Sequence, residues 1–273
     1  MDCVQNWEAY TAAEHRTWAR LYHRMLPVWD RCANRHFLEG VHSLHLDPDH
    51  IPRLTDVNRF LCPLTGFQAK PVAGYLPAFR FFDSLRKREF PTTITIRDAA
   101  RLDYLPEPDI FHDVAGHVPM HTDPAFAEAL VRFGDCAHTA AEIAAGDDRL
   151  ASMIRAMARF FWFTVEFGLM QSPGGLKACG SGLLSSHAEL EHALDSPRVQ
   201  RYPIQLEWVV NQSFEIDHFQ PLLFYVENFD HLFSLVGELE RWMKDGRLDN
   251  VAPGEPAVNE ADLQSFYCLP SVC

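Results

Sequence analysis

The sequence predicts a single, mainly α-helical domain with a few short β-strands. Apolar and aromatic side chains recur at three- and four-residue spacing over several long stretches, which is the pattern of amphipathic helices. Runs of β-branched residues are short and few. The chain has 273 residues, of which 47% are hydrophobic and 22% charged, so it can bury one large core. No repeat or shift in composition marks a domain boundary, so residues 1–273 are expected to form one domain.

The N-terminal part contains one long helical pattern and a stretch rich in helix breakers. Residues 5–45 repeat aromatic and leucine side chains at helical spacing, and Pro27 within them predicts a kink or a break. Residues 47–75 contain four prolines and two glycines, so loops and short turns are expected there. A helix over about 78–87 and a short strand over 90–97 should follow.

The C-terminal part is expected to be more regularly helical. Asp123 and Pro124 have the residue types of an N-cap and a first helical position, so a helix should begin there. Residues 149–170 read as one long, buried helix, and residues 231–244 as another that ends at an Asp-Gly pair. The Pro-containing segment of about 247–273 is expected to be a flexible tail.

Composition excludes several classes of protein. A formal charge of −13 disfavours binding to nucleic acid, and no apolar run approaches the ~20 residues needed to cross a bilayer. The N-terminus has neither the basic nor the apolar region of a secretory signal. The seven cysteines are scattered and odd in number, which favours reduced thiols and a cytoplasmic protein. The sequence does not determine whether Cys268 and Cys273 pair.

Two histidines and a glutamate are candidates for a metal site. His112 and His117 lie in one short segment, and Glu166 lies in an aromatic stretch where an unpaired carboxylate would be costly to bury. A bound cation would satisfy Glu166, and a buried arginine is the structural alternative. Two imidazoles and one carboxylate are the ligand set of non-haem Fe(II) oxygenases.

The spacing of the two histidines requires a distorted helix. Residues five apart on an ideal α-helix are rotated by about 140°, so His112 and His117 would not share a face. Gly116 would let the backbone deform at low steric cost. The same spacing argues against a zinc protease, whose motif needs histidines four apart.

Three segments resemble the pterin-dependent aromatic amino acid hydroxylases. These are 104–119, containing Pro-Asp-Ile-Phe-His-Asp and Gly-His-Val-Pro, 163–169, Phe-Thr-Val-Glu-Phe-Gly-Leu, and 182–186, Gly-Leu-Leu-Ser-Ser. The likeness is closest to the short bacterial phenylalanine hydroxylases and extends over most of the chain. It implies a single catalytic domain of the mainly α aromatic amino acid hydroxylase type, with iron in a central cleft.

The resemblance implies roles for individual residues. The iron ligands would be His112, His117 and Glu166. The residues that bind the amino acid would be Arg97, which holds the carboxylate, Trp162, which lines the ring pocket, Gly182 and Ser185. The pterin would be held by Gly74, Leu76 and Phe81, and Asp113 would act beside the metal through a water.

The resemblance further implies a monooxygenase that converts L-phenylalanine to L-tyrosine with Fe(II), O₂ and a tetrahydropterin, either tetrahydrobiopterin or a bacterial analogue. Trp162 argues against an indole substrate, because tryptophan hydroxylases usually carry Phe at that place. Leu105, Cys179 and His187 depart from the family pattern, as do His121 and Glu215. Another aromatic amino acid or ring position, such as tyrosine, tryptophan or meta-hydroxylation, therefore stays open.

Two other classes of function remain as alternatives. A zinc-dependent hydrolase would use the same three ligands and would act without O₂ or pterin. A non-catalytic relative would keep the pocket and lose a ligand, whereas all three ligands are present here. We expect a monomer that folds without its metal, binds an aromatic amino acid and a reduced pterin, and binds no membrane.

Overall fold

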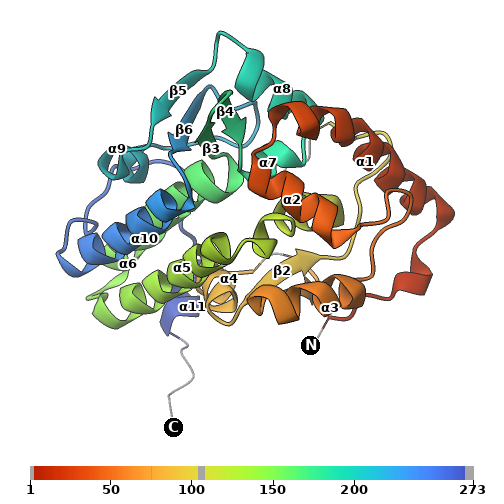
Figure 1. Cartoon of the computed structure of the whole chain (residues 1–273). Coiled ribbons are helices and arrows are strands. Elements are labelled where there is room, and N and C mark those ends of the chain that lie inside the picture. The colour runs from red at the N-terminus through yellow and green to blue at the C-terminus, as the bar shows by residue number, and fades with distance from the viewer. Residues whose placement is uncertain (1–2, 75, 104–107, 268–273) are drawn as a thin grey trace.

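The computed structural model describes residues 3–74, 76–103 and 108–267. The chain is mainly helical, with one small sheet and one pair of short strands, as the sequence predicts (Figure 1). Helix α5 (Pro124–Ile143) lies between α4 (Ala78–Arg86) and α10 (Phe229–Lys244), and it also contacts α6 (Asp147–Phe161). Among the described residues, no helix is both long and apolar enough to cross a membrane.

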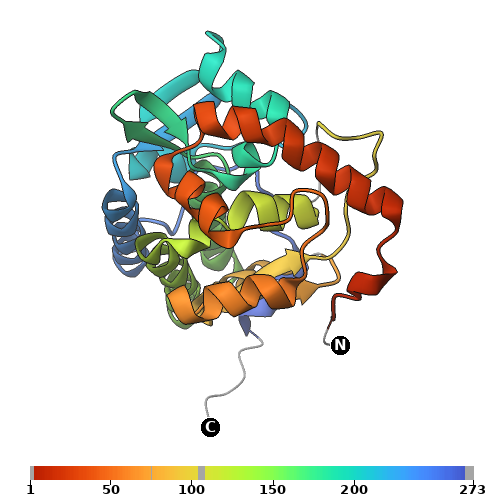
Figure 2. The same cartoon turned by 45° about the vertical axis from the view of Figure 1, so that its right-hand side comes forward.

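The N-terminal helices lie over one face of the molecule (Figure 2). Helix α1 (Ala12–Cys32) begins with a capping box between Thr11 and Glu14, and α2 (Arg35–Leu44) is capped by Asn34. The sequence predicts a kink or a break at Pro27, and the break is wrong, because α1 continues through Pro27 and ends at Cys32. Pro27 and His23 are exposed, so water can bond the carbonyl that proline leaves without a donor.

The breaker-rich stretch contains a helix that the sequence analysis did not predict. Helix α3 (Leu54–Thr65) also runs through a proline, Pro63, which is exposed. Leu54, Val57 and Leu61 are buried at three- and four-residue spacing, so one apolar face outweighs the proline near the helix end. Thus the expectation of loops over 47–75 is wrong for this helix.

The strands are short and lie in two groups. Strands β1 (Gln68–Val72) and β2 (Glu89–Thr93) pair in parallel, and β2 ends four residues before the predicted limit of 97. The second sheet has the order β4-β3-β6-β5. Its strands are β3 (Leu169–Ser172), β4 (Gly175–Ala178), β5 (Gln200–Pro203) and β6 (Leu222–Val226).

Three short helices complete the region around the second sheet: α7 (Ser181–Leu184), α8 (His187–Asp195) and α9 (Leu206–Asn211). One buried apolar cluster extends from Trp18 to Phe266 and includes residues of α7, α8 and α9. Trp29 of α1 donates its indole N–H to the Leu184 carbonyl at 2.7 Å, which ties the N-terminal helices to α7.

The predicted helix limits are partly confirmed. Helices α4, α5 and α10 lie where the sequence places them, and the Asp123 carboxylate accepts the N–H groups of Ala125 and Phe126 at the start of α5. The single helix over 149–170 is wrong, because α6 ends at Phe161 and β3 begins at Leu169.

The predicted flexible tail also differs from the structure. Residues 247–267 pack on the domain, with Leu248, Val251 and Phe266 buried and helix α11 (Glu260–Tyr267) lying beside α4 and α6 (Figure 1). Residues 268–273 lie outside the described residues.

Candidate active site

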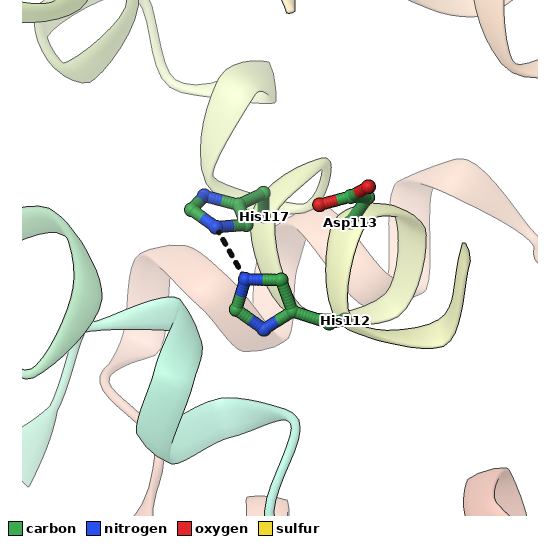
Figure 3. A group of neighbouring side chains, drawn as sticks. All are labelled: His112, Asp113 and His117. Carbon is green, nitrogen blue, oxygen red and sulfur yellow. Dashed lines mark hydrogen bonds between the residues drawn. The ribbon is translucent and has the colours of Figure 1, made fainter. Parts of the chain in front are cut away.

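A π-helical segment brings the two candidate histidines together. In η2 (Phe111–His117) the backbone bonds from residue i to i−5, as the Val118 N–H does to the Asp113 carbonyl at 3.3 Å. Residues five apart therefore share a face, and the Nε2 atoms of His112 and His117 lie 3.1 Å from each other (Figure 3). This is the helix distortion that the spacing requires.

A second π-helical turn positions the glutamate. In η4 (Trp162–Glu166), directly after α6, the Phe167 N–H bonds the Trp162 carbonyl at 2.8 Å. Gly168 follows, where a Cβ would lie only 2.1 Å from the Thr164 carbonyl oxygen. The chain can therefore fold tightly back toward the sheet only with glycine at this position.

The three side chains converge on one point. Glu166 Oε1 lies 3.2 Å from His117 Nε2, and Oε2 lies 3.6 Å from His112 Nε2. A metal at about 2.0–2.2 Å from each donor would place neighbouring donors about 3 Å apart, which is close to the spacing found. Within the described residues, the Glu166 carboxylate lies against these two imidazoles and not against an arginine, which is the structural alternative to a metal. The donor set fits a divalent metal.

The protonation states suit metal binding. Ser185 Oγ donates its hydrogen to the Ser181 carbonyl at 2.8 Å, so it can only accept a hydrogen bond from His112 Nδ1–H, at 2.8 Å. The Nε2 atom of His112 is then unprotonated, and its lone pair is available to a metal. Burial lowers the pKa of His112 to about 4, which keeps the imidazole neutral. Burial alone would raise the pKa of Glu166, but the neighbouring imidazoles lower it and favour the carboxylate.

Asp113 lies beside the histidine pair. Its carboxylate does not lie between the two Nε2 atoms (Figure 3). It accepts a hydrogen bond from the Thr93 N–H at 2.6 Å. Burial raises the pKa of Asp113 to about 7. The side chain is therefore held by β2, next to the ligands.

The candidate metal site lies where two cavities meet. The first cavity, of about 550 Å³, is lined by all four residues expected to bind the amino acid: Arg97, Trp162, Gly182 and Ser185. The second, of about 700 Å³, is lined by the residues expected to hold the pterin and by the residue expected beside the metal: Gly74, Leu76, Phe81 and Asp113. His112 and Glu166 line both cavities, so a metal there would face both ligands.

Arg97 is held in place by a residue to which the sequence analysis gave no role. Asp109 accepts two bonds from the guanidinium, from Nε and from Nη2, both at 2.8 Å, and also the His112 N–H at 2.9 Å. Only 8% of Arg97 is exposed, which excludes a surface salt bridge. Burial would raise the pKa of Asp109, but Arg97 outweighs burial and lowers it. Asp109 thus links Arg97 to His112, one of the candidate metal ligands.

The wall of the first cavity is aromatic. Trp162 stacks on Phe214 with ring centroids 4.0 Å apart and planes at 4°, and Phe167 lies on it at 4.3 Å. The Trp162 indole N–H donates to the Gln220 side-chain oxygen at 3.3 Å. Phe214 has no motif around it, so the sequence gives no signal of its place at the site.

Other residues of the first cavity come from distant parts of the chain. Glu189, Phe214, Ile216 and residues 256–259 line it, and none was predicted. Neither Cys179 nor His187 lines either cavity, so their departure from the family pattern does not touch the site directly. Leu105 lies outside the described residues.

Comparison with known proteins gives a consistent result. The model of the family described as biopterin-dependent aromatic amino acid hydroxylase matches residues 6–245. The chain is 39% identical over 258 residues to the phenylalanine-4-hydroxylase of Caulobacter vibrioides, covering 92% of this chain and 85% of that protein. It is also 40% identical over 226 residues to the tyrosine 3-monooxygenase of Rattus norvegicus, covering 81% of this chain and 43% of that protein.

Two solved structures of phenylalanine hydroxylase from Chromobacterium violaceum share the fold. One, with bound iron(III) and the oxidised cofactor 7,8-dihydrobiopterin, has a TM-score of 0.80 at 35% identity and covers 92% of this chain and 90% of that one. The other, with iron and phenylalanine bound, has a TM-score of 0.79 at 33% identity and covers 92% and 91%.

Proposed function

The chain belongs to the family of biopterin-dependent aromatic amino acid hydroxylases, and we propose that it hydroxylates L-phenylalanine to L-tyrosine at the site formed by His112, His117 and Glu166. It is an aromatic amino acid monooxygenase that uses Fe(II), a tetrahydropterin and O₂. The observation that carries the assignment to this site is the convergence of these three side chains where two cavities meet.

The residues of the first cavity would bind and orient the amino acid. Arg97, fixed by Asp109, still has N–H groups for the substrate carboxylate, a planar acceptor that suits a guanidinium. Trp162 and its aromatic neighbours would hold the substrate ring and exclude water around it. Gly182 lets the Phe167 ring pack closely on the chain at this cavity, because a Cβ there would lie 2.7 Å from the ring.

The residues of the second cavity would hold the pterin. Phe81 offers a flat apolar face, and the chain at Gly74 and Leu76 offers backbone polar groups. When bound, Fe(II) and tetrahydropterin supply the electrons that reduce O₂, and one oxygen atom enters the aromatic ring. His112, His117 and Glu166 would hold the iron, and the two cavities would place the amino acid and the pterin next to it.

Substrate identity rests on the likeness to phenylalanine-4-hydroxylases and on Trp162. Tyrosine, the substrate class in the name of the rat relative, is the second candidate. A zinc hydrolase is disfavoured by the family and by the second cavity, which hydrolysis does not need.

We further propose that the whole chain is one catalytic domain acting as a monomer in the cytoplasm. The apolar core is continuous from α1 to α11, and the five described cysteines are free thiols, as is usual in a reducing compartment.

The decisive experiment measures O₂ uptake by the Fe(II)-loaded protein with L-phenylalanine, L-tyrosine or L-tryptophan, with and without tetrahydropterin. We expect pterin-dependent uptake and L-tyrosine formation from L-phenylalanine. Glu166→Gln should lower iron-supported turnover by about 100-fold or more, the loss expected when one ligand of a catalytic metal is removed. Glu39→Gln, at an exposed position of α2 that lines neither cavity, is the matched control. Uptake that is indifferent to tetrahydropterin would refute the proposal.

A further inference from the structure

The first cavity has a wall that lies beyond the family match. The match ends at residue 245, yet Pro256, Ala257, Val258, Asn259 and Asp262 line the cavity together with Arg97 and Trp162. None of these five lines the second cavity. We call residues 252–267 the C-terminal strap.

The first end of the strap is fixed by a buried arginine. Arg159 of α6 is 0% exposed, and its guanidinium donates to the carbonyls of Ala252 (2.8 Å), Pro253 (3.2 Å) and Glu255 (2.9 Å). A fourth bond reaches the Val210 carbonyl at 3.0 Å. Burying a guanidinium is costly unless its donors are satisfied, and here the strap supplies most of the acceptors. The strap is therefore anchored close to Trp162, which directly follows α6.

The second end of the strap caps another helix of the site. Helix α4 begins after Pro77 and has no capping side chain of its own. Instead, the Asp262 carboxylate accepts the Ala78 N–H at 3.0 Å, and Ser265 Oγ accepts the Phe79 N–H at 3.3 Å. Helix α11 thus lies against the start of α4 (Figure 1), which carries Phe81 between the two cavities.

We propose that the C-terminal strap is a specificity-determining wall of the amino acid site, in which residues 256–259 limit the size of the substrate side chain. Arg159 and Asp262 are positioning residues that hold this wall in place. Its lining is mainly apolar, with Pro256 and Val258 half-buried, which suits an aromatic side chain more than a charged one. The inference rests on the proposed function, because it takes the first cavity as the amino acid site.

The test changes the size of one strap residue in the full, iron-loaded enzyme. Val258→Trp should raise the KM for L-phenylalanine at least about tenfold and leave the KM for tetrahydropterin within about twofold of wild type. Val258→Ala should raise kcat/KM for L-tryptophan relative to L-phenylalanine at least about fivefold. Ala261→Trp, at an exposed position of the same strap that does not line the cavity, is the matched control and should change neither ratio.

A binding measurement separates this inference from the proposed function. Isothermal titration calorimetry should show about tenfold or more weaker binding of L-phenylalanine to Val258→Trp than to wild type, whether or not the protein turns over. Asp262→Ala should weaken the binding of L-phenylalanine several-fold, because the C-terminal strap would no longer be held against the start of α4. The inference is overturned if both Val258 variants keep wild-type affinity and wild-type preference between the two amino acids. Absence of hydroxylation in a wild-type protein that shows this binding pattern would instead overturn the proposed function.

Discussion

The two candidate histidine ligands are held in place by different contacts with their surroundings. Ser185 fixes the tautomer of His112, and Asp109 bonds both the backbone of His112 and the side chain of Arg97. The Nδ1 atom of His117 is buried and has no partner among the described residues. The two histidines are therefore oriented differently: a side-chain bond holds His112, and packing against Phe90, at 4.6 Å between centroids, holds His117.

Loss of the Ser185 hydroxyl should weaken metal binding without unfolding the protein. Ser185→Ala removes the acceptor that keeps the proton of His112 on Nδ1. Outer partners of this kind are worth about 10- to 100-fold in metal affinity. Anaerobic titration with Fe(II) measures the effect. Ser186→Ala, whose hydroxyl bonds the Asp103 carbonyl instead, should bind iron as wild type does; equal affinities of the two variants would contradict the role of Ser185.

Glu189 should make stability depend on pH. Burial raises the pKa of this carboxyl to about 7, although the Gln220 N–H donates to it at 3.2 Å. The folded state then holds the proton at pH values where the unfolded state, with an ordinary glutamate pKa, has lost it. Between about pH 4.5 and 7 the folded state binds more protons, so this group's contribution to the unfolding free energy falls as pH rises.

Glu189→Gln removes this titration and keeps an acceptor for the Gln220 N–H. Relative to wild type, the variant should therefore gain about 2 kcal/mol of stability on going from about pH 5.5 to about pH 8. Urea denaturation at the two pH values measures the difference. Glu191→Gln, at a half-exposed position on the same helix, is the control. A stability difference between wild type and Glu189→Gln that does not change with pH would contradict the prediction.

Two π-helical turns and two glycines determine the shape of the site at the scale of elements. The sequence predicts that the histidines can meet only in a distorted helix, because their spacing of five is incompatible with one α-helical face. It does not predict the corresponding turn at Trp162–Glu166, since the aromatic run there has ordinary helical spacing. Likewise, Pro27 and Pro63 lead to wrong predictions of a break and of loops. A proline costs a helix less when the carbonyl four residues before it, which loses its N–H donor, faces water.

Gly116 should be needed for the contact between η2 and α7. A Cβ at this position would lie 3.0 Å from the Ser181 carbonyl oxygen and 3.1 Å from the Ser185 Cβ. Gly116→Ala should therefore cost about 1–3 kcal/mol and lower the affinity for Fe(II), because it would push η2 away from Ser185, which orients His112. Chemical denaturation and metal titration measure the two effects.

Gly237→Ala in α10 is the matched control for that substitution. Its Cβ would meet only the Arg132 side chain, at 3.6 Å, which is an ordinary contact. Alanine inside a helix should then add about 0.5–1 kcal/mol of stability and leave iron binding unchanged. If the two substitutions had the same effect on iron affinity, the close packing of η2 on α7 would not matter for the metal site.

At the scale of the whole molecule, the sequence predicts the fold class, three side chains that converge and part of the lining of both cavities, because short motifs carry them. It does not predict the partners that reach the site from far along the chain. Asp262 is 184 residues from Ala78, whose N–H it accepts, and no local pattern connects the two positions. For the same reason, the composition of the C-terminal strap predicts a flexible tail. In the structure, Phe266 of this strap is 2% exposed and packs on Phe79.

The continuous core predicts that the fold does not depend on iron. The three candidate ligands lie at the junction of two cavities, while the buried apolar cluster extends from α1 to α11 and contains none of them. Removal of iron with a chelator should therefore leave the far-UV circular dichroism unchanged. Iron at about 100 times its dissociation constant should add about 2.7 kcal/mol to the unfolding free energy, because it binds only the folded state. A chelated protein that loses its helical signal, as metal-dependent small domains do, would show that the three ligands hold the fold together.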